Sequence, residues 1–171
     1  MSFQQIAEAR YSLRKFDGRP VDEKTMGKIL DAIRVAPSAK NLQPVRIYLI
    51  QSDEALEKIN SVCPCIYGSK TVLLACYDSS TAWSNPFHPE IRSGQIDASI
   101  VLSHAMLAAK ELGVDSCWVC RFDNSEVERV MGLPENIKTV SIMPLGYPAE
   151  GAGPSERHTV RKPLDEWVTR M

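Results

Sequence analysis

A long apolar segment between Gly94 and Leu112 is the strongest constraint on how this chain can fold. Its spacing predicts a helix of about 19 residues, which would be roughly 28 Å long. Apolar residues lie on more than one side of that helix, namely Ile96, Ile100, Val101, Met106, Leu107 and Ala108. Such a helix is expected in the middle of a domain or at an interface between subunits. Gly113 is expected just past its C-terminal end.

Shorter periodic segments surround this helix. Helices are expected over residues 2–9 and from Ser125, as the cap, to Met131. Two further helices are expected between them. One is capped by Asp22 and ended by Pro37, and the other is capped by Ser52 or Asp53. Strands are expected at residues 45–50, 71–77, 116–119 and 139–145. Residues 78–90 are rich in turn formers and are expected to form a loop. The elements alternate irregularly with no linker, which predicts a single α/β or α+β domain over residues 1–171.

Composition excludes several classes of protein. A net charge of −1 gives no support to a nucleic-acid partner, and no apolar run reaches the ~20 residues that a membrane span needs. The N-terminus lacks a basic region followed by an apolar stretch, so we expect no signal peptide and a cytoplasmic protein. Nine Lys and Arg against five Asp and Glu in residues 1–46 suit a small anionic ligand, or else form an ordinary solvated surface.

Arg10, Ser12 and Arg14 alternate along the chain. In an extended segment they would point the same way, and two guanidinium groups with a hydroxyl make a donor set of the size of a phosphate. A basic loop after a helix is the alternative. A second cationic segment, Arg161-Lys162-Pro163, could form another half of a phosphate clamp.

The segment from Ala36 to Pro44 lies between a predicted helix and a predicted strand. Its Ser, Asn and Gln side chains could bind the edge of a heterocycle, and two prolines stiffen it. Taken by itself, the segment could equally be a simple turn.

Five cysteines, an odd number, indicate reduced thiols. Cys117 and Cys120 could form a redox or zinc half-site with Cys63 and Cys65. However, residues i and i+3 of a strand face opposite sides, so we expect no metal site. Of the histidines, His104 is expected in the core or at an interface, and His88 lies in the loop.

Five motifs in register resemble the FMN-dependent nitroreductase family. They are Arg10-x-Ser-x-Arg14-x-Phe16, Pro37-Ser38-x-x-Asn41-x-Gln43-Pro44, Leu112-Gly113-x-x-Ser116-Cys117-Trp118-Val119, Gly146-Tyr147-Pro148 and Arg161-Lys162-Pro163-Leu164. The resemblance spans nearly the whole chain. It implies an α+β fold with a mixed β-sheet flanked by helices in three α/β/α layers. It also implies an intertwined homodimer that binds FMN at the subunit interface.

The resemblance also implies which residues meet the cofactor. Arg10 and Ser12 would hold the phosphate with Arg161, and Lys162 would lie nearby. Arg14 would reach the ribityl or pyrimidine side. The other implied cofactor-binding residues are Tyr11, Pro37, Ser38, Ala39, Asn41, Gln43, Cys120 and Arg121, several of those in 37–43 coming from the partner chain. Relatives often have a smaller residue or an acid where Cys120 and Arg121 stand, so Arg121 either fills the acceptor cavity or turns to solvent.

The implied reaction is a ping-pong hydride transfer from NADH or NADPH through FMN to an electron-poor small molecule, such as a nitroaromatic or a quinone. FMN carries the chemistry, so no side chain is assigned as catalytic. The alternative is a flavin-binding or thiol/zinc redox protein without nitroreductase turnover.

Overall fold

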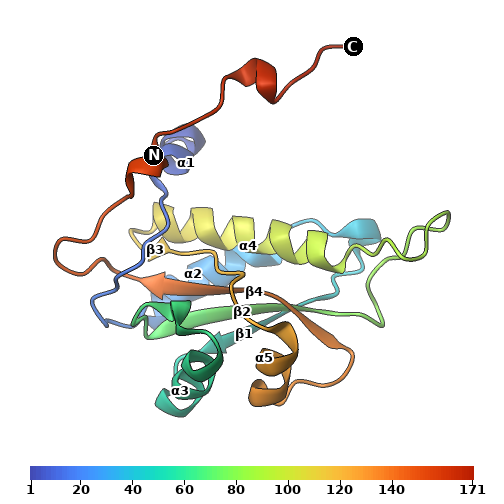
Figure 1. Cartoon of the computed structure of the whole chain (residues 1–171), viewed down its shortest axis with the longest axis horizontal. Coiled ribbons are helices and arrows are strands. Elements are labelled where there is room, and N and C mark those ends of the chain that lie inside the picture. The colour runs from blue at the N-terminus through green and yellow to red at the C-terminus, as the bar shows by residue number, and fades with distance from the viewer.

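The computed structural model describes all residues from 1 to 171 and arranges them in three layers (Figure 1). The middle layer is a sheet of four strands in the order β1-β2-β4-β3, which are Val45–Ile50 (β1), Thr71–Asp78 (β2), Asp115–Ser116 (β3) and Ile137–Gly146 (β4). Helices Glu23–Arg34 (α2) and Gly94–Glu111 (α4) cover one face, and Asp53–Val62 (α3) and Asn124–Met131 (α5) cover the other. Helix Phe3–Ala9 (α1) packs beside α4. The expected α+β architecture in three layers is confirmed.

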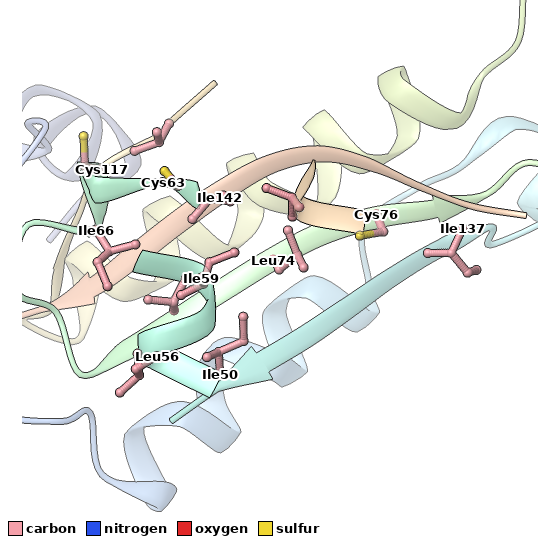
Figure 2. Packing of buried hydrophobic residues seen from close by; sticks show 13 residues of the cluster. Ile50, Leu56, Ile59, Cys63, Ile66, Leu74, Cys76, Cys117, Ile137 and Ile142 are labelled. Atoms are coloured by element: carbon pink, nitrogen blue, oxygen red, sulfur yellow. The ribbon is translucent and has the colours of Figure 1, made fainter. Parts of the chain in front are cut away.

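Strand β2 serves both cores because its side chains alternate between the two faces of the sheet. Leu73 and Ala75 belong to the buried cluster under α2 and α4. Leu74 belongs to the opposite cluster of 13 buried residues, together with Ile59 and Ile142 (Figure 2). This is why residues 71–77 read as a continuous apolar run rather than an alternating one.

Two expected elements differ from the structure. The strand expected at 116–119 pairs regularly only at its start, and Val119 returns to the sheet as an isolated bridge to Ile142. The interruption lies opposite Pro144, which has no N–H to donate to the ladder. The cap of α5 is Asp123 rather than Ser125, because the Asp123 carboxylate accepts the Glu126 N–H at 3.1 Å.

The sheet contains less parallel strand pairing than the expected mixed sheet would have. Each pair of its four strands is antiparallel. The parallel component is a single bridge between Ser12 and Ser116, which ties the extended N-terminal segment to the end of the sheet.

Helix α4 is buried along one side only. Ala98, Leu102, Ala105 and Ala109 are fully buried against the sheet, whereas Ile96 is 58% exposed. At the start of the helix, a Cβ atom on Gly94 would lie 2.0 Å from the Tyr77 ring, so only glycine allows this approach. Neither α4 nor any other helix has the length and apolar character required to span a membrane.

The Cys76 thiol predicts a loss of stability at alkaline pH. Burial raises its pKa from 9.0 to about 11, against the opposing effect of a hydrogen bond with Thr139. The neutral thiol therefore stabilises the fold below pH 9, and this contribution is lost as the pH rises through 11. The measurement is urea unfolding of the wild-type protein and of Cys76→Ala at pH 9 and at pH 11. Between these pH values we expect the free energy of unfolding to fall by about 2–3 kcal/mol more in the wild-type protein than in Cys76→Ala. Equal falls in both proteins would contradict this.

Candidate functional site

Two segments from opposite ends of the sequence line one cavity of about 220 Å³. Arg10, Tyr11, Ser12 and Arg14 come from the segment after α1, and Ser155, Arg157, His158 and Arg161 come from the C-terminal segment. Four arginines and three residues with a hydroxyl group thus line this space, and no carboxylate lines it. A guanidinium can donate two parallel hydrogen bonds to a phosphate, so this donor set fits a terminal phosphate.

A partly buried ion pair supports the cavity from behind. Lys110 Nζ lies 2.8 Å from Asp115 Oδ1 and 5.1 Å from the centre of the Tyr11 ring. Burial raises the pKa of Tyr11, and the charge of Asp115 and a hydrogen bond to it act in the same direction. On the other side of Tyr11, the His158 ring packs edge-on with the centroids 6.2 Å apart. Tyr11 therefore joins the end of α4 to the C-terminal segment.

The extended segment is fixed through Leu13. Its side chain is fully buried, and its N–H donates to Ser116 O at 2.9 Å. Ser12 and Arg14 flank this anchor and line the cavity with Arg10, so the alternate residues of the motif do share one space.

The thiol of Cys117 lies close to this segment. Burial raises its pKa, whereas the positive charges of Arg14 and Arg10 and a hydrogen bond with Ser12 lower it. All five cysteines are free, and no group of three or more His, Cys, Asp or Glu side chains is placed to hold a metal ion.

The segment 37–44 is strained. Lys40, Asn41 and Gln43 all have φ between +50° and +55°, in the left-handed region that side chains disfavour. Each such residue costs on the order of 1–3 kcal/mol, and such strain clusters at functional sites. The Ser38 hydroxyl helps to hold the turn by accepting the Gln43 N–H at 3.0 Å.

Asp97 anchors this strained segment to α4. Its buried carboxylate accepts the Ala39 N–H at 3.0 Å and the Ser93 hydroxyl at 2.7 Å. Beside the segment lies a more apolar cavity of about 430 Å³, lined by residues that include Ile33, Ile47, Val101, Ser38 and Gln43.

The structure does not bring the two predicted groups of cofactor-binding residues together within one chain. The 37–43 segment is tied to Asp97 and the arginine cavity to Lys110. Asp97 and Lys110 lie near opposite ends of α4, thirteen positions apart, which is about 20 Å along the helix axis.

The remaining predicted residues are exposed. Cys120 Sγ accepts a hydrogen bond from Trp118 Nε1 at 3.2 Å. Arg121 is exposed and takes part in no ion pair within the chain. Lys162 does not line the arginine cavity, because its Nζ pairs with Glu166 at 2.9 Å.

Sequence reasoning missed Ser155, Arg157 and His158 at the cavity and Asp97 on α4. Ser155-x-Arg157 has the same alternation as Ser12-x-Arg14, which was a usable signal. Asp97 was also visible as an acid inside an apolar helix, since such a carboxylate needs nearby donors.

Comparisons with known proteins agree on one family. The model of the nitroreductase family matches residues 7–65 and 63–147. A solved nitroreductase family protein of Clostridium difficile 630 is 36% identical, with a TM-score of 0.92 over 99% of this chain and 98% of that one. A Methanothermobacter thermautotrophicus protein, whose name assigns it to the NADH dehydrogenases and NAD(P)H nitroreductases, is 33% identical over 90% of this chain and 81% of its own length. The FMN reductase [NAD(P)H] of Bacillus subtilis is 28% identical over 85% of this chain and 66% of its own.

Removing the Asp97 carboxylate should destabilise the protein and loosen the 37–43 segment. In Asp97→Ala the Ala39 N–H and the Ser93 hydroxyl both lose a charged acceptor, so we expect a loss of about 2–3 kcal/mol in urea unfolding. Hydrogen exchange at the Ala39 amide should accelerate. In the matched control Asp97→Asn, the amide can still accept from Ala39 and donate to Ser93, so most of both effects should disappear. Wild-type behaviour of Asp97→Ala would show that Asp97 does not hold the segment.

Proposed function

Because this chain belongs to the nitroreductase family, we propose that it reduces a small electron-poor acceptor, such as a nitroaromatic or a quinone, in a ping-pong sequence. The protein is an NAD(P)H-dependent flavin oxidoreductase, and its cofactor is FMN. The observation that carries the proposal is the cavity in which Arg10, Ser12, Arg14 and Arg161 converge, because its donors suit the terminal phosphate of FMN.

The residues of this chain bind and orient the cofactor. Arg10, Ser12 and Arg161 hold the phosphate, and Tyr11 supports them through its contact with His158. Arg14 reaches toward the ribityl or pyrimidine side, where a cation stabilises negative charge. When bound, FMN supplies the hydride-transfer chemistry, so no side chain is required as an acid or a base.

A second copy of the chain completes each site in this proposal. The segment that holds Pro37, Ser38, Ala39, Asn41 and Gln43 is anchored at Asp97, about 20 Å along α4 from Lys110, which contacts Tyr11 of the arginine cavity in the same chain. They therefore serve the cofactor held by the other chain of a homodimer. Support comes from the partly exposed apolar side of α4, which a two-fold interface would bury.

Cys120 and Arg121 are proposed to approach the flavin through their backbone. Both side chains are exposed, and long arginine stems carry their charge to water. With Arg121 turned outward, the acceptor cavity stays open to aromatic rings. Five free thiols favour a reducing compartment, and we propose that the protein works in the cytoplasm.

The decisive experiment is anaerobic reduction of the purified protein. We expect a yellow protein that releases FMN on heating, loses its colour with NADH or NADPH, and regains it with a quinone or a nitroaromatic. FAD in the released fraction, or colour that neither nicotinamide removes, would refute the proposal. A protein that binds FMN without turnover would instead be a flavin carrier.

Arg10→Ala should weaken FMN binding by about 1.5–3 kcal/mol, the range for a hydrogen bond to a charged group. This corresponds to roughly a 10- to 100-fold increase in Kd, measured by titration of the apoprotein with FMN. Lys24→Ala removes the same charge from the exposed side of α2 and should leave the Kd unchanged. Equal affinities for all three proteins would mean that Arg10 carries only surface charge.

A further inference from the structure

Three of the five thiols gather in the core beneath α3. Cys63 and Cys117 belong to the cluster of 13 buried residues, and the partly exposed Cys65 packs against it. Figure 2 shows Cys63 and Cys117 at the same end of that cluster. The cluster lies on the face of the sheet opposite α4, so a second copy bound along the exposed side of α4 leaves these contacts within one chain. The proposed reaction uses none of these thiols, and they form no metal site.

The extended N-terminal segment is hydrogen-bonded to both stretches of chain that carry these thiols. Leu13 N–H donates at 2.9 Å to the carbonyl of Ser116, the residue before Cys117. Three residues later, Phe16 N–H donates at 3.3 Å to Tyr67 O, at the end of the short turn that holds the other two thiols. A movement of one thiol-bearing stretch toward the other therefore displaces the N-terminal segment.

Electrostatic effects also link these side chains. Burial raises the pKa of Tyr67, and a hydrogen bond with Cys65 and the charges of Cys65 and Cys117 raise it further, whereas Arg14 lowers it. Burial likewise raises the pKa of Cys117, and the charge of Cys65 acts in the same direction. Cys65 and Cys117 thus lie close enough to influence each other and the arginine of the candidate site.

We propose that Cys65 and Cys117 are a redox pair that closes to a disulfide and thereby weakens the binding of FMN. Cys65 attacks first, because it is partly exposed whereas Cys117 is buried. Its sulfur displaces water from hydrogen peroxide and becomes a sulfenic acid, and the Cys117 thiol then displaces a second water and forms the S–S bond. Each sulfur is oxidised by one electron, and one peroxide is reduced to two waters.

The disulfide reaches the cofactor site through Ser12. In the reduced protein Cys117 is hydrogen-bonded to Ser12, which lines the arginine cavity together with Arg14. Closing the disulfide removes the S–H group and draws Cys117 toward Cys65, so this bond is broken and Ser12 moves. The step rests on the proposed function, which assigns Ser12 and Arg14 to FMN. Because such coupling is reciprocal, bound FMN disfavours the disulfide by the same factor.

Peptide mapping of the full chain tests the redox pair. The reduced, flavin-free protein is treated with hydrogen peroxide, its remaining thiols are alkylated, and it is digested with trypsin. Cleavage after Lys and Arg leaves Cys65 in the peptide 59–70 and Cys117 in the peptide 111–121. Each peptide holds a second cysteine, Cys63 or Cys120, so fragmentation of the linked peptides identifies the bonded pair.

We expect the Cys65–Cys117 link after peroxide and its loss in dithiothreitol. Two separate alkylated peptides, or a link made through Cys63 or Cys120, would overturn the pair. The map uses the unaltered chain, so this result does not depend on how any variant folds.

Titration with FMN tests the effect on the cofactor. We expect the Kd of the oxidised wild-type protein to be about fivefold or more above that of the reduced protein, and dithiothreitol to restore it. Cys65→Ala should have the same Kd before and after peroxide. The matched control Cys63→Ala removes the neighbouring thiol of the same turn and should keep the wild-type response.

The two measurements separate the redox switch from the proposed function. If the disulfide forms and FMN binds both states equally, the switch is wrong and the flavin site stands. If the disulfide forms in a protein whose reduced state binds no FMN, the redox pair stands and the proposed function is wrong.

Discussion

Two buried carboxylates, one near each end of α4, hold the segments that we assign to the cofactor. Asp97 accepts the Ala39 N–H and the Ser93 hydroxyl, and Asp115 pairs with Lys110, which lies over Tyr11. A carboxylate removed from water is stabilised only when its hydrogen bonds are made, so each of these acids restricts its neighbours to a narrow set of positions. The helix between them is packed on the sheet along its buried side, so it fixes the position of one carboxylate relative to the other.

This arrangement explains why the candidate site is divided. Asp97 and Lys110, the anchors of the 37–43 segment and of the arginine cavity, are about 20 Å apart along one rigid helix of the same chain. Neither segment can approach the other without unwinding α4, whose small residues Ala98, Ala105 and Ala109 are fully buried on the sheet. A site that needs both segments is therefore most simply completed by a second copy.

Both halves of the site are unfavourable in the isolated chain. Left-handed backbone at Lys40, Asn41 and Gln43 stores conformational strain, and four arginines without an ion-pair partner line a cavity that has no carboxylate in its lining. Features of this kind persist when the surrounding structure fixes them in advance and a ligand offsets their cost. Asp97 and Ser38 fix the 37–43 segment. Tyr11 and the Lys110–Asp115 ion pair fix the arginine cavity.

The sequence by itself determined most of the elements and suggested the kind of ligand. Period-2 and period-3.6 patterns depend on neighbours a few residues apart, so β2, α2 and α4 were predictable, and so was the sharing of one space by Arg10, Ser12 and Arg14. Tertiary structure alone decided what depends on contacts through space. It placed Arg157 and His158 opposite Tyr11, and it turned Lys162 away to Glu166. It also interrupted the strand after Ser116, because the residue across the ladder is Pro144, and no local pattern records which residue lies opposite.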